Sequence, residues 1–241
     1  MTINLNRLNL SAEPLNAAIN ATIEQASLAK HAGNQPRGYL GASLIGDECS
    51  RKIQFEWMTA STFPARVLSI FARGHYFEIE SKQQLVGAGF KFAPAEMLAF
   101  TAADGLMAGH ADGIIIRAPD DVELALPALW ECKGLNAKNF RAVERDGLAK
   151  VFPRYAAQVA LYQNFLGVTN PALITIVNAV TCERLHFTVA FDARLAQEAS
   201  DRAVTVIEAT RAGELLPRFD PSCEDFRCKM CSHLERCLRH G

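Results

Sequence analysis

The sequence lacks several features that would place a protein in a broad class at once. Its 241 residues contain no apolar run long enough to cross a bilayer, no internal repeat and no low-complexity tract. The net charge is only −1, so the whole chain is not a generic binder of polyanions. The first ten residues alternate polar and apolar side chains, so we expect no signal peptide, no membrane partner and a cytoplasmic protein.

The cysteines also exclude one class, because an odd number in a reducing compartment argues against a disulfide framework. Seven are present, and three of them have the spacing C-x2-C-x5-C at Cys228, Cys231 and Cys237. Such a set brings thiolates onto one cation or cluster, and it needs a fourth ligand. That ligand is either Cys223, which is local, or Cys49, which is remote. Four thiolates suit both zinc and an iron–sulfur cluster.

The periodicity of apolar residues predicts an α/β protein with a central mixed sheet flanked by helices. The predicted helices span residues 12–32, 48–58, 64–85, 136–146, 154–166 and 193–212. The predicted strands span residues 91–100, 106–117, 124–133, 172–180 and 184–191. Asp192 is the expected N-cap of the last long helix. Residues 1–40 are interpreted as an N-terminal helical segment without an assigned role, and residues 41–241 as the functional domain.

Two predicted strands carry charge where their apolar content predicts burial. Asp112 lies in the first, and Glu131 and Lys133 lie in the second, on one face because side chains alternate along a strand. Burying unpaired charge is costly, so these groups need a partner or a metal ion. If the strands pair, Asp112 lies beside Glu131, and two such carboxylates suit Mg²⁺ or Mn²⁺. Lys133 would then orient or deprotonate a water molecule, or stabilise charge on a phosphate.

The alternative is a structural ion pair between Lys133 and either carboxylate. On spacing alone this alternative is as good as the metal site, because E-x-K in a strand is a weak motif.

The ordered set of motifs resembles the PD-(D/E)xK nuclease superfamily, in its RecB-like branch. The resemblance implies a restriction-endonuclease-like core and metal-dependent cleavage of DNA. Asp112, Glu131 and the backbone carbonyl of Cys132 would hold the metal ion, and Lys133 would help to activate the water. The proline that usually precedes the aspartate is replaced by Ala111.

Two accessory motifs extend the resemblance. His75, on a predicted helix upstream of the strands, matches a histidine ligand of the RecB-like branch and would favour Mn²⁺. Gln158 and Tyr162 match a Q-x-x-x-Y motif, whose two side chains share one helix face near the metal or the DNA. Alone, these residues are also typical of ordinary structural positions. The candidates for phosphate contacts, chosen on charge and proximity, are Lys138, Lys150 and Arg154.

The cysteines match a subset of RecB-like nucleases, which includes CRISPR-associated exonucleases and AddB-type nuclease domains. In that subset one cysteine before the core and three at the C-terminus bind a 4Fe-4S cluster. The resemblance therefore implies a cluster at Cys49, Cys228, Cys231 and Cys237, in a subdomain formed by the N-terminal region and residues 223–241. Closing so long a loop is expected to stabilise the fold.

These observations predict a DNA exonuclease that acts on single strands or DNA ends. The alternative is a non-catalytic iron–sulfur or zinc module that binds DNA, and a zinc-stabilised interaction protein is a third hypothesis. The chain lacks the P-loop pattern G-x-x-x-x-G-K-[ST], so it contains no helicase motor of its own. Repair, phage-replication and CRISPR-adaptation proteins all remain candidate partners, and the sequence leaves the oligomeric state open.

Overall fold

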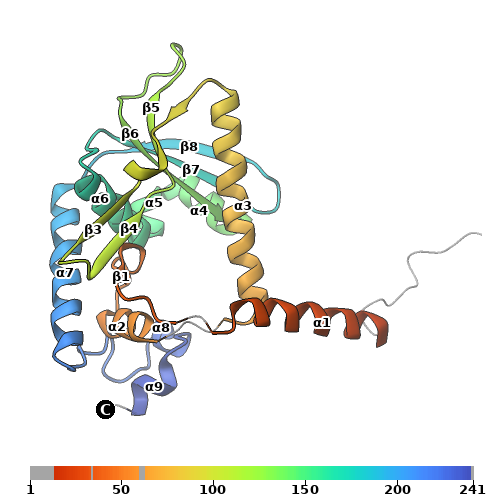
Figure 1. The fold of residues 1–241 in the computed structure, drawn as a ribbon, viewed down its shortest axis with the longest axis vertical. Coiled ribbons are helices and arrows are strands. Elements are labelled where there is room, and N and C mark those ends of the chain that lie inside the picture. The colour runs from red at the N-terminus through yellow and green to blue at the C-terminus, as the bar shows by residue number, and fades with distance from the viewer. Residues whose placement is uncertain (1–13, 34, 60–62, 240–241) are drawn as a thin grey trace, which may run out of the picture.

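A computed structural model describes residues 14–33, 35–59 and 63–239, and Figure 1 shows how their helices and strands are arranged. The helices are α1 (Pro14–His31), α2 (Ser50–Met58), α3 (Ala65–Gly87), α4 (Ala137–Asp146), α5 (Leu148–Val151), α6 (Pro153–Leu166), α7 (Ala193–Arg211), α8 (Phe226–Lys229) and α9 (Leu234–Arg239), with short 3-10 turns η3 (Ala42–Leu44) and η4 (Ala95–Met97). The strands are β1 (Leu40–Gly41), β2 (Lys91–Phe92), β3 (Ala99–Ala102), β4 (Met107–His110), β5 (Gly113–Arg117), β6 (Ala128–Leu135), β7 (Ala172–Asn178) and β8 (Arg184–Val189).

The strands form two mixed sheets flanked by helices, which confirms the predicted α/β class. The larger sheet has the order β2-β5-β6-β7-β8, and only its β6–β7 pair is parallel. The smaller sheet has the order β1-β4-β3, with a parallel β1–β4 pair and an antiparallel β3–β4 pair. The sequence predicted one central sheet, so the second sheet corrects that prediction.

The division into two sheets has a local cause at Ala111 and Asp112, where the strand predicted over 106–117 is divided in two. The backbone N–H of Ala111 donates to the carbonyl of Leu98 at 2.8 Å, in register with the β3–β4 pairs, so the chain stays bonded to the smaller sheet as far as Ala111. Gly113 then starts β5 in the larger sheet, so close to Phe92 that a Cβ atom there would lie 2.7 Å from the ring. Asp112 therefore lies where the chain passes from one sheet to the other.

Strand β6 is buried on both faces and organises the core. On one face Trp130 and Cys132 pack with Phe77 of α3. On the other face Leu129 packs in the cluster that contains Tyr162 of α6. The alternation of β6 therefore directs Glu131 and Lys133, like Leu129, toward the α6 side of the sheet.

Helix α6 is the most deeply buried helix among the described residues, with an unbroken buried run over residues 156–163. Its small residues Ala156, Ala157 and Ala160 allow close packing between the sheet and α7. Pro153 occupies the first turn and Gly167, at φ +67°, ends the helix in the left-handed region. The predicted cap of α7 is confirmed, because the Asp192 side chain accepts from the Leu195 N–H at 2.9 Å.

Helix α1 projects from the rest of the molecule and has no buried residue (Figure 1). Its main contacts within the described structure are with α3. The helix predicted over 12–32 is confirmed from Pro14 to His31, whereas residues 12 and 13 lie outside the described residues. No helix in the described part of the chain is both long and apolar enough to cross a membrane.

Candidate functional site

Asp112 and Glu131 meet at the edge where β5 pairs with β6. Gly113 pairs with Trp130, which brings the preceding Asp112 beside Glu131. The Cys132 N–H donates to Asp112 Oδ2 at 2.8 Å, and the Asp112 N–H lies 3.4 Å from Glu131 Oε1. Each carboxylate is thus fixed by the backbone of the other segment, as the predicted pairing of the two strands requires.

Lys133 joins the two carboxylates. Its Nζ donates to Glu131 Oε2 at 2.7 Å and lies 3.8 Å from Asp112 Oδ2. Burial alone would lower the pKa of Lys133, but the charges of Glu131 and Asp112 outweigh burial and raise this pKa. Lys133 is therefore a fixed ammonium group, suited to hold an anionic oxygen or orient a water molecule rather than to accept a proton.

Glu131 is the most deeply buried of the three side chains Asp112, Glu131 and Lys133. Its side chain is 1% exposed, and burial raises its pKa to about 7, with a further increase from Asp112 and an opposing effect from Lys133. A carboxyl group with such a pKa exchanges its proton readily near neutral pH. A cation that binds here must therefore compete with a proton.

Helix α6 supplies the groups that cover this centre. Gln158 Nε2 donates to Glu131 Oε2 at 3.3 Å, and the Tyr155 ring centroid lies 5.5 Å from Lys133 Nζ. Tyr162 lies one turn further on, and burial raises its pKa to about 12. Of the predicted Q-x-x-x-Y pair, only Gln158 contacts a carboxylate, while Tyr162 packs edge-on against Phe100.

Two residues that lie near the centre were not among those predicted from the sequence. Lys82 of α3 donates to the backbone carbonyl of Asp112 at 3.1 Å and lies over the Phe92 ring at 5.0 Å. Tyr155 is the other missed residue. The one available signal for Lys82 was its position two helical turns after His75, which places both side chains on one helix face.

His75 does not contact the carboxylates in this structure. Its side chain is 69% exposed, and its Nδ1 lies 3.2 Å from Glu78. Across residues 14–33, 35–59 and 63–239, no three His, Cys, Asp or Glu side chains are close enough together to hold a metal ion. The ligand role of His75 therefore stays a prediction.

The three predicted phosphate contacts lie in different settings. Lys138 is exposed on α4, and Lys150 is exposed and pairs with Asp146 at 3.0 Å. Arg154 donates its Nε–H to the carbonyl of Ser43 at 3.1 Å. Two of the three thus extend into solvent, while Arg154 is engaged within the fold.

The donor set fits a divalent cation with hard ligands. Two carboxylates and one ammonium leave the centre one negative charge in excess when all three groups are ionised. Asp112 is 19% exposed, so the centre opens to solvent on the aspartate side while Glu131 anchors it from within. Carboxylate oxygens in this arrangement suit Mg²⁺ or Mn²⁺.

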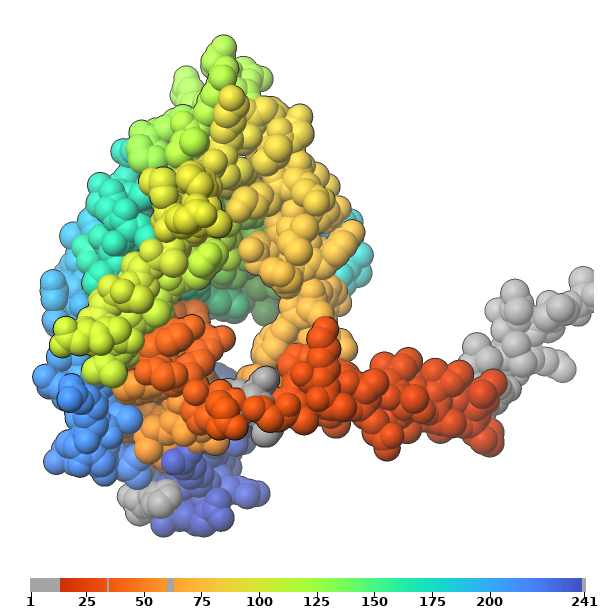
Figure 2. All heavy atoms as spheres, in the orientation of Figure 1, coloured from red at the N-terminus to blue at the C-terminus, as the bar shows by residue number. Residues whose placement is uncertain are grey.

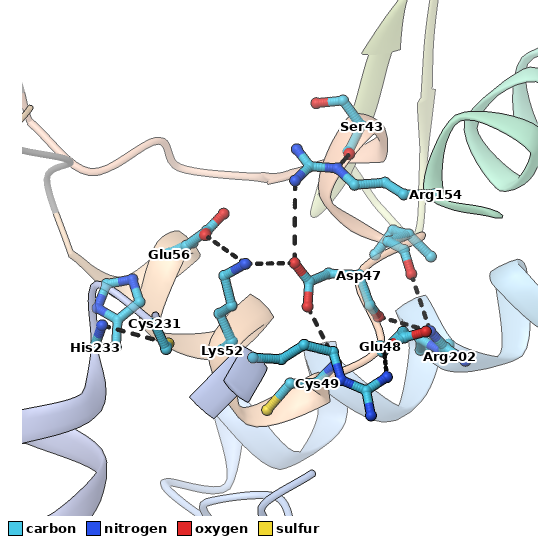
Figure 3. Close-up of polar contacts among 12 residues, drawn as sticks. Ser43, Asp47, Glu48, Cys49, Lys52, Glu56, Arg154, Arg202, Cys231 and His233 are labelled. Carbon is cyan, nitrogen blue, oxygen red and sulfur yellow. Dashed lines mark hydrogen bonds and ion pairs between the residues drawn. The ribbon is translucent and has the colours of Figure 1, made fainter. Parts of the chain in front are cut away.

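Away from this centre, the two ends of the domain meet around a cavity of about 250 Å³. Arg227 of α8 pairs with Glu48, and Arg51 Nε donates to the carbonyl of Leu216 at 2.6 Å. Figure 3 shows Cys49 and Cys231 in this region, from the start of α2 and from the C-terminal segment. The cysteines that line the cavity are Cys49, Cys223, Cys228, Cys231 and Cys237.

The chemistry of this cavity fits an anionic group. Arg51 and Arg218 line it, and Arg51 Nη1 and Arg218 Nε are buried without a hydrogen-bond partner in the described structure. Buried donors without partners require an explanation, and a bound ion or water molecule is one of several. A metal or cluster held by four thiolates is anionic. The five cysteines line this cavity, but within the described part of the chain no three of them lie close enough together to hold a metal ion, so their ligand role stays a prediction.

A larger cavity of about 1050 Å³ lies among the segment after α1, the end of β1 and helix α3. Figure 2 shows the molecule hollowed between α3 and the segment that follows α1. Aromatic and basic side chains share its lining, and they include Tyr39, Phe71, Arg37, Lys30, His75 and Arg154.

No protein-family model matches the chain, and no curated protein matches it by sequence. Solved structures do match its fold. A crystal structure of SSO0001 is 13% identical, with a TM-score of 0.53 over 92% of this chain and 97% of that one. An alkaline exonuclease (LHK-Exo) from Laribacter hongkongensis is 13% identical, with a TM-score of 0.52 over 80% of this chain and 93% of that one. The same exonuclease in complex with dAMP gives a TM-score of 0.54 at 13% identity, over 78% of this chain and 93% of that one. At these identities the likeness shows a shared fold.

Proposed function

We propose that the chain is a metal-dependent DNA nuclease of the PD-(D/E)xK type with a restriction-endonuclease-like core. The observation that carries the proposal is the triad itself, in which Lys133 lies 2.7 Å from Glu131 and 3.8 Å from Asp112. Two findings support it: Asp112, just before β5, comes together with Glu131 and Lys133 of β6, and an alkaline exonuclease shares the fold.

Each residue of the centre has a distinct task in this proposal. Asp112, Glu131 and the backbone carbonyl of Cys132 would hold Mn²⁺ or Mg²⁺, which supplies Lewis-acid activation of water and charge compensation at the phosphate. Lys133 orients the water or holds a phosphate oxygen by its fixed positive charge. Gln158 restrains Glu131 from the α6 side through its 3.3 Å hydrogen bond.

The substrate we propose is single-stranded DNA or a DNA end. Stacking aromatics and cations that follow the backbone are the means by which proteins bind single strands without sequence preference. The large cavity combines both kinds of group, because Tyr39 and Phe71 line it together with Lys30 and Arg37. His75, the predicted nitrogen ligand, also lines this cavity.

The cysteine-lined cavity is proposed to hold a 4Fe-4S cluster, with Cys228, Cys231 and Cys237 as three ligands and Cys49 as the fourth. All seven cysteines of the chain are free in the structure. The unpartnered N–H groups of Arg51 and Arg218 support an anionic occupant. When bound, the cluster would join the start of α2 to the C-terminal segment.

The mode of cleavage is tested by comparing linear with circular single-stranded DNA in the presence of Mn²⁺. An exonuclease degrades the linear strand and leaves the circle intact, because the circle has no end. Degradation of the linear and the circular DNA at equal rates would contradict the exonuclease assignment but would still support nuclease activity. Binding of the linear and the circular DNA without degradation of either would favour a non-catalytic DNA-binding module.

Mn²⁺ affinity is expected to fall with decreasing pH, because the cation needs Glu131 ionised and burial raises the pKa of this residue to about 7. Below that pH the proton competes with the metal, so affinity should drop about tenfold per pH unit, and above it affinity should level off. Calorimetric titrations in buffers of different ionisation enthalpy measure the proton released on binding. An affinity that stays constant from pH 5.5 to 8 would contradict the expectation.

A further inference from the structure

We infer that Arg154 is a positioning residue for the nuclease centre rather than a phosphate contact. In this inference, which rests on the proposed function, Arg154 fixes the first turn of α6 against the segment that precedes Cys49. Helix α6 then holds Gln158 and Tyr155 in register with Glu131 and Lys133.

The first step is the contact between Arg154 and that segment, which Figure 3 shows. Arg154 Nε donates to the carbonyl of Ser43 at 3.1 Å, and its Nη1 lies 4.0 Å from Asp47 Oδ2. The backbones also touch, because a Cβ atom at Gly46 would lie 2.5 Å from the carbonyl oxygen of Arg154. Only glycine at this position permits so close an approach.

The second step is the rigidity of the segment. Asp47 accepts from the Cys49 N–H at 3.1 Å and from Lys52 Nζ at 2.6 Å. Its carbonyl accepts from Arg202 Nη1 of α7 at 2.7 Å. Figure 3 shows these contacts converging on Asp47. The segment is therefore held by α2, α7 and Arg154 together, so it can serve as a fixed reference for α6.

The third step leads from Arg154 to the centre along a single turn of helix. Tyr155 is the next residue, and Gln158 is four positions on, about 6 Å along the axis. Because α6 is closely packed over residues 156–163, a shift of its first turn moves the helix as a rigid body. A displacement at Arg154 is therefore passed to the hydrogen bond between Gln158 and Glu131.

The competing role for Arg154 is contact with a DNA phosphate, since its side chain is 43% exposed and lines both cavities. The two roles differ in what a lysine can replace. A lysine preserves a phosphate contact, but a single ammonium does not reproduce the guanidinium geometry that reaches both Ser43 and Asp47.

The experiment compares Arg154→Gln, Arg154→Lys and Gly46→Ala with a matched control, Arg194→Gln, whose side chain is exposed on α7. The readouts are kcat on single-stranded DNA at saturating Mn²⁺, the DNA Kd without metal at several salt concentrations, and the melting temperature. We expect kcat to fall about tenfold to a hundredfold in all three variants, with the DNA Kd changed less than about twofold and no rescue by lysine. The control should match the wild type.

Several results would overturn the inference. Arg154 would be a phosphate contact if Arg154→Gln weakened DNA binding and reduced the slope of log affinity against log salt concentration by about one. In that case Arg154→Lys should restore both the affinity and the slope. Unchanged kcat in Arg154→Gln and Gly46→Ala would remove the positioning role. Should Gly46→Ala fail to fold, Arg154→Gln carries the test alone. A wild type that binds DNA but does not cut it would contradict the proposed function itself, which separates that failure from this one.

Discussion

Substituting Asp112 with asparagine is expected to lower Mn²⁺-dependent DNA cleavage by about a thousandfold, equivalent to ~4 kcal/mol of transition-state stabilisation. The carboxylate lies beside Glu131 and 3.8 Å from Lys133, so the substitution removes one of the two charges available to a divalent cation. A neutral amide oxygen is a poor substitute ligand for a hard cation. Cleavage of labelled single-stranded DNA under single-turnover conditions measures the loss.

The asparagine is chosen because it retains the fold. Its side-chain oxygen can still accept from the Cys132 N–H, the bond that Asp112 Oδ2 makes at 2.8 Å. The matched control is Asp120→Asn, which removes an exposed carboxylate from the loop after β5 and should leave cleavage unchanged. Cleavage that persists in Asp112→Asn at the wild-type rate would remove Asp112 from the catalytic centre.

If the proposed iron–sulfur cluster is present, substituting Cys231 with serine is expected to abolish its binding and to lower the melting temperature. Cys231 and Cys49 line one cavity from the two ends of the domain, so a cluster there would close a long loop. Structural metal sites contribute their binding free energy to folding. Iron content and visible absorption of the anaerobically purified protein measure the cluster, and thermal unfolding measures the stability.

Cys182→Ser is the matched control, because Cys182 is exposed and lies outside the cavity lining. It should keep its iron and its melting temperature. A wild-type protein that contains zinc and no iron would contradict the cluster and favour the tetrahedral zinc site.

The choice between Cys49 and Cys223 follows from the same measurement. Both line the cavity, and both thiols contribute to the raised pKa of Cys228, after burial. If Cys49 is the fourth ligand, Cys49→Ser loses iron while Cys223→Ser keeps it. The reverse pattern would show that the four ligands come from the C-terminal segment alone.

Much of the fold could be predicted from local patterns. Helix α7 begins after the Asp192 cap, and β7 and β8 lie within the two segments predicted to be strands. The break between β4 and β5 could not be predicted, because Met107 to Arg117 looks continuous in its apolar content. What divides it is a change of partner strand, from β3 before Asp112 to β6 after it.

The candidate centre also has some features that the sequence predicts and others that depend on tertiary packing. Glu131 and Lys133 share a face because of strand alternation, which the sequence states directly. Lys82 and Tyr155 reach the centre through the packing of α3 and α6, which depends on tertiary contacts that the sequence does not display. The role of His75 rests on the family resemblance, and the structure leaves its side chain 69% exposed beside Glu78.

The most direct test of the central claim is mass spectrometry of the products formed from a linear single-stranded DNA in water enriched in heavy oxygen. The protein is purified without air and incubated with Mn²⁺ or with a chelator. Hydrolysis at the Asp112, Glu131 and Lys133 centre predicts shortened products whose new terminal phosphate carries one heavy oxygen atom, only when Mn²⁺ is present. An intact strand in the presence of Mn²⁺ would contradict the assignment of this chain as a nuclease.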